Sequence, residues 1–190
     1  MTKHRINRTL VIDTAAHYVN THGFAALTLA AVAHELGIKL PSLYNHVSGI
    51  DDLQGALAAH AAEALFVCCQ DAAIGRSGDT ALLAIAHAYR DFIRHNQGTY
   101  AATLHPQPRE NPALVQANQA LMQLFTRVLE PYALSPDDTI HVLRGLRSLV
   151  HGFCTLEATR TFAVPVDPAE SFRIMLEWYI ASIPHITHIQ

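Results

Sequence analysis

The chain has 190 residues, of which half are hydrophobic and 15% are charged, and its formal net charge is −3. This length can bury a sizeable core, and the composition excludes a disordered tail. The longest stretch without a charged residue, 14–34, contains Asn20, His22 and Gly23 and is therefore not a membrane span. No long apolar segment follows the N-terminus, and the three cysteines form no CxxC pair, so we expect a cytoplasmic protein that needs neither a disulfide nor a membrane.

The charges are unevenly distributed along the chain. Residues 1–50 carry four basic and two acidic side chains, whereas the other 140 residues carry nine basic and fourteen acidic ones. A mildly basic segment ahead of an acidic body favours an N-terminal module that binds a polyanion, and chance scatter of a few charges is the alternative.

Hydrophobic periodicity predicts helices along the whole chain, and no segment alternates as a strand would. Gly23, Gly37 and residues 75–79 interrupt the pattern, a bend is expected at Gly98, and three prolines make residues 105–112 a loop. The sequence thus predicts an all-α protein, with helices at about residues 7–20, 29–36, 41–47, 49–73, 80–96, 98–104, 113–132, 136–161 and 168–183.

Residues 34–47, HELGIKLPSLYNHV, predict the second half of a helix-turn-helix. Thr28 is a good N-cap for the helix before the turn, Gly37 can make the turn, and Pro41 suits the first turn of the next helix. Only Leu43 and Val47 have the spacing of core-facing residues. The short helix therefore presents its polar side chains to the outside.

This exposed face suits the major groove of DNA. Asn45 can pair bidentately with adenine, and Leu40 and Pro41 can contact a thymine methyl group, while hydroxyl, imidazole and ammonium groups can reach phosphates. The predicted DNA-binding residues are Thr28, Lys39, Leu40, Pro41, Ser42, Tyr44, Asn45 and His46. A helical hairpin packed inside an all-α enzyme or scaffold is the alternative reading of the same spacing.

The segment TLAAVAHELGIKLPSLYNHVSGIDDL resembles the DNA-binding domain of TetR-family (tetracycline-repressor-like) transcriptional regulators. The resemblance covers residues 5–57 and is carried by these residues: Thr28, Val32-Ala33, Leu36-Gly37-Ile38 and Leu43-Tyr44-Asn45-His46-Val47. It implies a three-helix DNA-binding domain at residues 1–48 and a larger helical-bundle domain for ligand binding and dimerisation at residues 49–190.

The resemblance further implies that Tyr44 and His46 hold phosphates. Many relatives carry a lysine near the start of the fourth helix that also grips phosphate. This chain has Ile50 there, followed by Asp51 and Asp52, so it lacks the lysine for that contact and can bind DNA in a more salt-limited way.

The later segment LRSLVHGFCTLEATRTF resembles a TetR subgroup named for a Trp-His-Gly motif, with Val150 in place of the tryptophan. Gly152 in mid-helix costs about 1 kcal/mol relative to alanine. Close approach of a partner's helix would explain this glycine, and close packing within its own chain is the alternative. The resemblance implies a homodimer that reads a palindromic double-stranded operator with its two short helices about 34–36 Å apart, and a small-molecule effector that releases it.

Aromatic and polarizable side chains on the middle helices are candidates for the effector site, although such residues also fill ordinary cores. The candidate ligand-binding residues are Phe66, Cys69, Tyr89, Phe92, Tyr100, Phe125 and His151. The default effector is an apolar or aromatic small molecule.

Motifs for other functions are missing. The sequence contains no HExxH, ExxH, GxGxxG, P-loop or GxSxG, so we expect neither an enzyme nor a cofactor nor a metal site. Cys154 lies three residues after His151, which leaves a Cys-His pair open. The alternatives to a ligand-released repressor are a metal-responsive regulator, suggested by the thirteen histidines, and a helical interaction protein that has lost DNA binding, suggested by the acidic residues after Ile50.

Overall fold

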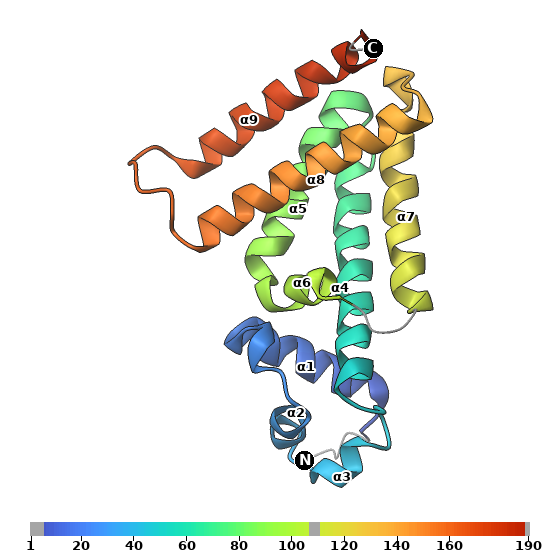
Figure 1. The fold of residues 1–190 in the computed structure, drawn as a ribbon, viewed down its shortest axis with the longest axis vertical. Coiled ribbons are helices and arrows are strands. Elements are labelled where there is room, and N and C mark those ends of the chain that lie inside the picture. Colours follow the sequence, from blue (N-terminus) through green and yellow to red (C-terminus); the bar gives the residue numbers. More distant parts are fainter. Residues whose placement is uncertain (1–5, 107–110, 189–190) are drawn as a thin grey trace. The chain divides into compact units, whose positions relative to one another are not determined.

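The computed structural model describes residues 6–106 and 111–188, and the regular secondary structure within them is helical (Figure 1). Short 3₁₀ helices follow α1, α7 and α9. The α-helices of this described part are α1 (Arg8–His22), α2 (Leu29–Glu35), α3 (Leu40–Leu43), α4 (Ile50–Ala73), α5 (Gly78–His95), α6 (Gln97–Leu104), α7 (Pro112–Leu129), α8 (Pro136–Ala158) and α9 (Pro168–Ser182). The all-α prediction is confirmed.

The helices pack into two compact units. The first combines the chain up to Ala64 with His95–Asn118, and the second combines Leu65–Arg94 with the chain from Gln119 onward. The first unit therefore adds half of α4, all of α6 and the start of α7 to the three short helices. The functional boundary expected at residue 48 is not tested by this packing and stays a prediction.

The core of the first unit is apolar and collects one face from each of its helices. Val11 and Val19 of α1, Val32 of α2, Leu43 of α3 and Leu53 of α4 are all fully buried. Asn7 caps α1 by accepting a hydrogen bond from the backbone N–H of Leu10 at 2.8 Å, which fixes where this helix begins.

The contact between α1 and α6 is unusually close. A methyl group on Gly98 would overlap the carbonyl group of Val19, so only glycine fits at this crossing. Asn20 strengthens the contact because its Oδ1 accepts a hydrogen bond from the backbone N–H of Thr99 at 2.9 Å. The predicted bend at Gly98 is therefore wrong: the chain turns at Asn96, between α5 and α6, and Gly98 serves helix packing.

The second unit is built around a buried ion pair. Arg90 of α5 is only 5% exposed and donates from Nε and Nη2 to Glu157 of α8, at 3.1 and 2.5 Å. Its guanidinium carbon lies 5.5 Å from the ring centre of Phe153 and 4.9 Å from that of Phe172 on α9. The charge is thus paired and held against two aromatic rings, as a buried guanidinium requires.

Helices α8 and α9 run beside each other in this unit (Figure 1). The hydroxyl of Tyr179 on α9 donates to the carbonyl oxygen of Val142 on α8 at 2.6 Å, and its ring fills the space that a side chain at Gly145 would occupy. A methyl group on Gly152, by contrast, would meet no described atom of this chain within 4 Å. Close packing within the chain therefore explains Gly145 and does not explain Gly152.

Candidate nucleic-acid interface

Helix α2 has well-formed ends. At its start, the Thr28 hydroxyl accepts a hydrogen bond from the backbone N–H of Ala31 at 3.1 Å. At its end, Gly37 has a φ of +67°, and the N–H groups of Gly37 and Ile38 donate to the carbonyls of His34 and Ala33, at 2.9 and 3.0 Å. This pair of bonds is a Schellman motif, so the predicted roles of Thr28 and Gly37 in α2 are confirmed.

Helix α3 is shorter than predicted. It spans only Leu40–Leu43, with Pro41 in its first turn, instead of about seven residues. Its continuation tightens, because the N–H groups of Asn45 and His46 donate to carbonyls only three residues earlier, at 3.4 and 2.9 Å. We call residues 40–46 the reader segment: one α-helical turn followed by a 3₁₀-like turn.

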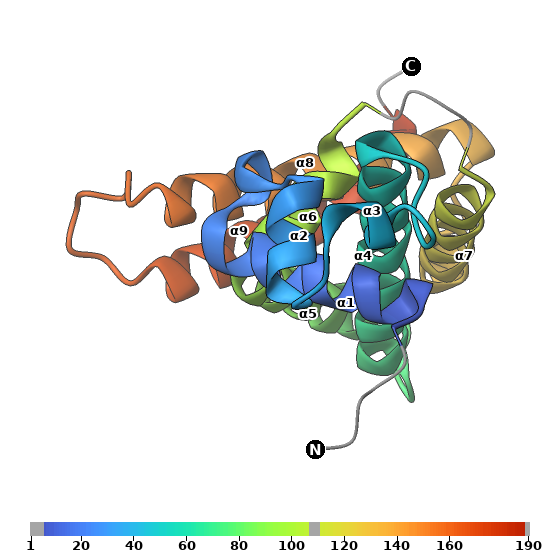
Figure 2. The same ribbon diagram turned by 90° about the horizontal axis from the view of Figure 1, so that it is seen from below.

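The reader segment has one buried and one exposed side. Leu43 and the following Val47 are 0% and 2% exposed and anchor it in the core of the first unit. Tyr44 is 53% exposed, and Ser42 and Asn45 also face solvent. Figure 2 views the first unit from the end that carries α2 and α3. All eight residues predicted for DNA contact are therefore open to solvent: His46 is half-buried, and Thr28, Lys39, Leu40 and Pro41 are exposed like the other three.

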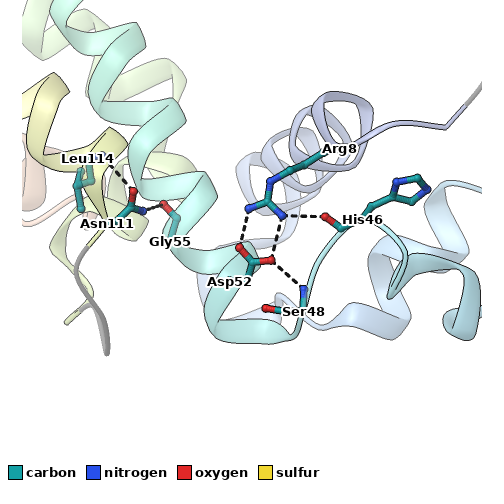
Figure 3. Close-up of polar contacts among 7 residues, drawn as sticks. All are labelled: Arg8, His46, Ser48, Asp52, Gly55, Asn111 and Leu114. Carbon is teal, nitrogen blue, oxygen red and sulfur yellow. Dashed lines mark hydrogen bonds and ion pairs between the residues drawn. The ribbon is translucent and has the colours of Figure 1, made fainter.

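The residues after the reader segment are not a simple acidic patch. Ile50 is half-buried and packs against the core of the first unit, so the position where the resemblance led us to expect a lysine makes an apolar contact. Asp51 is exposed, whereas Asp52 accepts a hydrogen bond from the backbone N–H of Ser48 at 2.8 Å (Figure 3). Asp52 thus occupies the first turn of α4, where a negative charge favours the helix.

Asp52 also binds Arg8 at the start of α1 (Figure 3). Nη1 and Nη2 of Arg8 donate to Oδ2 and Oδ1 of Asp52 at 2.9 and 2.6 Å, and Nη1 donates as well to the carbonyl oxygen of His46 at 2.8 Å. The hydrogen bond to Arg8, the bond from Ser48 and the nearby positive charge lower the pKa of the Asp52 carboxyl to about 2. The carboxylate is therefore charged and paired at neutral pH.

Sequence reasoning missed this pair. Arg8 counts as a free cation in the charge pattern and Asp52 as a repulsive acid, since nothing local links residues 44 positions apart. One signal was available: an acid at the third position of a helix commonly accepts a hydrogen bond from the backbone just before that helix.

The predicted effector residues fall into both units. Tyr100, on α6, is a buried residue of the first unit. The other six belong to the second unit: Phe66 and Cys69 on α4, Tyr89 and Phe92 on α5, Phe125 on α7 and His151 on α8. Their contact with an effector stays a prediction.

Two of the three cysteine thiols, those of Cys69 and Cys154, have the character of core residues, whereas Cys68 is exposed. Cys69 and Cys154 are 0% and 3% exposed, and burial raises the pKa of these thiols to about 12 and about 11. A protonated, buried thiol is a poor nucleophile, which weighs against a catalytic pair of Cys154 with His151.

Two further features bear on the alternatives. Nowhere in residues 6–106 and 111–188 do three His, Cys, Asp or Glu side chains gather as a metal ion would need. Among the helices that the structure describes, none is both long and apolar enough to cross a lipid bilayer.

A capped helix, a glycine turn and an anchored segment with one exposed polar side define a helix-turn-helix DNA-binding protein. Residues 82–179 match the family model described as the tetracyclin repressor-like C-terminal domain. The chain belongs to the TetR family of transcriptional regulators, a family of DNA-binding proteins and not of enzymes.

Individual relatives agree with this assignment. The chain is 32% identical over 179 residues to the HTH-type transcriptional regulator YobS of Bacillus subtilis, covering 94% of this chain and 93% of YobS. A structure of a Rhodococcus sp. RHA1 protein superposes with a TM-score of 0.78 at 20% identity, over 94% and 95% of the two chains. A variant of TetR from Acinetobacter baumannii AYE, solved in complex with minocycline, superposes with a TM-score of 0.72 at 21% identity. The match covers 96% of this chain and 98% of that one. These two structures share the fold.

Proposed function

We propose that this TetR-family protein is a cytoplasmic homodimeric repressor that binds a palindromic double-stranded operator and is released by a small-molecule effector. The observation that carries the proposal is the reader segment, which exposes Ser42, Tyr44 and Asn45 on a turn anchored by buried Leu43 and Val47. A solvent-facing row of hydrogen-bonding groups beside a helix-turn-helix is what base and phosphate contacts require.

The side chains divide by reach and chemistry. Asn45 and Ser42 hydrogen-bond base edges, and Leu40 and Pro41 contact a thymine methyl group. Phosphates are held by the remaining members of the set: Thr28, Lys39, Tyr44 and His46. Thr28 contributes together with the first N–H groups of α2, where the helix dipole favours an anion.

Dimerisation follows from the small footprint of one reader segment, since a short element reads few base pairs and two-fold symmetry doubles the contacts. The exposed Trp178 on α9, at 74%, and the open space over Gly152 on α8 support an interface formed by these two helices. The Trp-His-Gly subgroup is part of this proposal, with Val150 buried where the tryptophan would stand.

The effector is an apolar or aromatic small molecule held by the larger helical domain, residues 49–190. The minocycline complex of a family member with the same fold supports this choice of ligand class. A ligand that shifts α4 need supply only about 1–3 kcal/mol of coupling to change operator affinity 5- to 150-fold.

Selection of bound sequences from random duplex DNA tests the DNA-binding part of the proposal. The wild-type protein should enrich a palindromic site at low salt, and a variant carrying Tyr44→Ala and Asn45→Ala should not. Enrichment of a palindrome by the wild type alone supports both the reader segment and the dimer. Failure of the wild-type protein to enrich any sequence would contradict the proposal and favour an interaction protein that has lost DNA binding.

A further inference from the structure

The reader segment cannot hold its own orientation. It contains a single α-helical turn, Leu40–Leu43, and isolated helices need several turns to persist in water. Leu43 and Val47 anchor its apolar side, but apolar packing is non-directional and leaves rotation about that anchor weakly specified. Directional contacts must therefore fix where Tyr44 and Asn45 point.

Such contacts converge on the end of the segment. The carbonyl oxygen of His46 accepts from Arg8, and the backbone N–H of Ser48 donates to Asp52, so the backbone is held on both sides of Val47. Arg8 and Asp52 are themselves joined by two parallel hydrogen bonds of 2.9 and 2.6 Å. A two-pronged pair of this kind adds geometric specificity as well as attraction.

The pair also links three elements of the first unit. Arg8 opens α1, Asp52 lies in the first turn of α4, and the held backbone is the exit from α3 (Figure 3). Both terminal nitrogens of the Arg8 guanidinium are occupied by protein acceptors, which leaves this cation poorly placed to serve as a phosphate ligand.

We propose that Arg8 and Asp52 are positioning residues for DNA binding: the pair orients the reader segment through the His46 carbonyl and the Ser48 amide, so that an acidic side chain beside the DNA-binding surface raises operator affinity. The proposal rests on the DNA-binding function above. Electrostatics alone gives the opposite sign, since removing a negative charge near DNA strengthens binding.

The test compares neutralisation of two neighbouring acids in the full-length protein. Asp52→Asn removes the carboxylate that binds Arg8, and Asp51→Asn is the matched control, because Asp51 is exposed on the same helical turn. Affinity is measured for the duplex most enriched by the wild-type selection and for a scrambled duplex of equal length. We expect Asp52→Asn to weaken binding of the selected duplex about five- to tenfold, the net effect of losing one ordinary hydrogen bond, while binding of the scrambled duplex stays equal or rises.

Asp51→Asn should leave both affinities equal to wild type or raise both slightly. The proposal is overturned if Asp52→Asn binds the selected duplex as tightly as Asp51→Asn does. It is also overturned if Asp52→Asn loses affinity for both duplexes equally, which would mean partial unfolding, and a melting curve of each variant identifies that case.

Arg8→Lys provides an independent readout. Lysine keeps the positive charge and loses the planar fork. If Arg8 is a positioning residue, Arg8→Lys should lose about as much affinity for the selected duplex as Asp52→Asn does. The slope of log affinity against log salt concentration should stay unchanged. A phosphate contact predicts a nearly normal affinity for Arg8→Lys, and a slope smaller by about one unit for Arg8→Ala, and would overturn the proposal. If the wild-type protein enriched no duplex, that result would instead contradict the proposed DNA-binding function.

Discussion

Individual polar side chains of the first unit act mainly on the backbone ends of helices. Asn7 and Thr28 cap α1 and α2, and Asp52 holds the chain just before α4. Asn7 and Thr28 each satisfy an N–H group that a helix start would otherwise leave without a partner, and Asp52 satisfies the N–H of Ser48 just outside α4. Local chemistry at these residues therefore decides where the helices begin.

Removing the Thr28 hydroxyl tests this at one residue. Thr28→Ala should lower the free energy of unfolding by about 1 kcal/mol, because an N-cap side chain is lost while the exposed site has no packing to lose. Denaturant unfolding measures the change. Thr9→Ala is the control, since Thr9 is an exposed residue inside α1, and it should change the stability by less than about 0.5 kcal/mol. Equal losses in the two variants would contradict the capping role.

The Asp52 carboxyl predicts a specific pH dependence. Its pKa in the folded protein, about 2, lies below the ordinary value of 3.8, so the folded state binds this proton more weakly than the unfolded state. The stabilisation is therefore complete above the ordinary pKa and is lost as pH falls towards 2. Unfolding curves of wild type and Asp52→Asn should differ by a constant free energy from pH 7 to about 5 and converge below about pH 4. A difference that stays constant down to pH 2 would argue against this assignment.

Contacts between elements depend on what each helix presents at its crossing point. Gly98 lets α6 approach α1, and Tyr179 fills the space over Gly145 between α8 and α9. Arg90 joins α5 to α8 and α9 inside the second unit. These contacts are long-range in sequence, and each depends on a single residue type.

Two glycines give opposite expectations for the same substitution. Gly98→Ala should destabilise the protein by about 2 kcal/mol or more, because its methyl group overlaps the Val19 backbone, which cannot rotate away. Gly152→Ala meets no described atom of this chain and should stabilise the helix of an isolated monomer by up to about 1 kcal/mol. Denaturant unfolding at low protein concentration measures both. If Gly98→Ala left the free energy of unfolding unchanged, α1 and α6 would have to separate easily.

The buried ion pair predicts that replacing Arg90 destabilises the protein strongly and that replacing the nearby Arg94 does so only slightly. Arg90→Ala should lower the free energy of unfolding by about 3 kcal/mol, because it leaves the Glu157 carboxylate without its cation and removes the guanidinium that lies over two phenyl rings. Arg94 lies one turn later on α5 with a side chain 52% exposed, so Arg94→Ala should change stability by less than about 1 kcal/mol. Similar losses in the two variants would contradict the structural role of the pair.

At the scale of the whole molecule, the exposed apolar residues bear on assembly. Trp178 is 74% exposed on α9, and an aromatic side chain of this size in the open is typical of an interface centre. Trp178→Lys should weaken self-association at least tenfold in sedimentation equilibrium. Ile74→Lys is the control, since Ile74 is also 68% exposed but follows the end of α4. Equal behaviour of the two variants would place the dimer interface elsewhere.

The helical class, the helix boundaries to within a few residues and the helix-turn-helix could all be predicted from the amino-acid sequence. These features depend on local chemistry: an apolar period, the cap at Thr28, the positive φ available to Gly37 and the proline at the start of α3. The exposure of Tyr44 and Asn45 was predictable for the same reason, since the buried positions of a short helix fix the exposed ones.

Contacts between residues far apart in the sequence could be seen only in the fold. Arg8 and Asp52 are 44 positions apart, and Arg90 and Glu157 are 67 apart, so no periodic pattern relates them. The same holds for the crossing at Gly98, which the sequence marks only as a flexible point. The length of the reader segment also depended on its surroundings, because one short helical turn takes its conformation from the contacts that hold it and not from its own propensity.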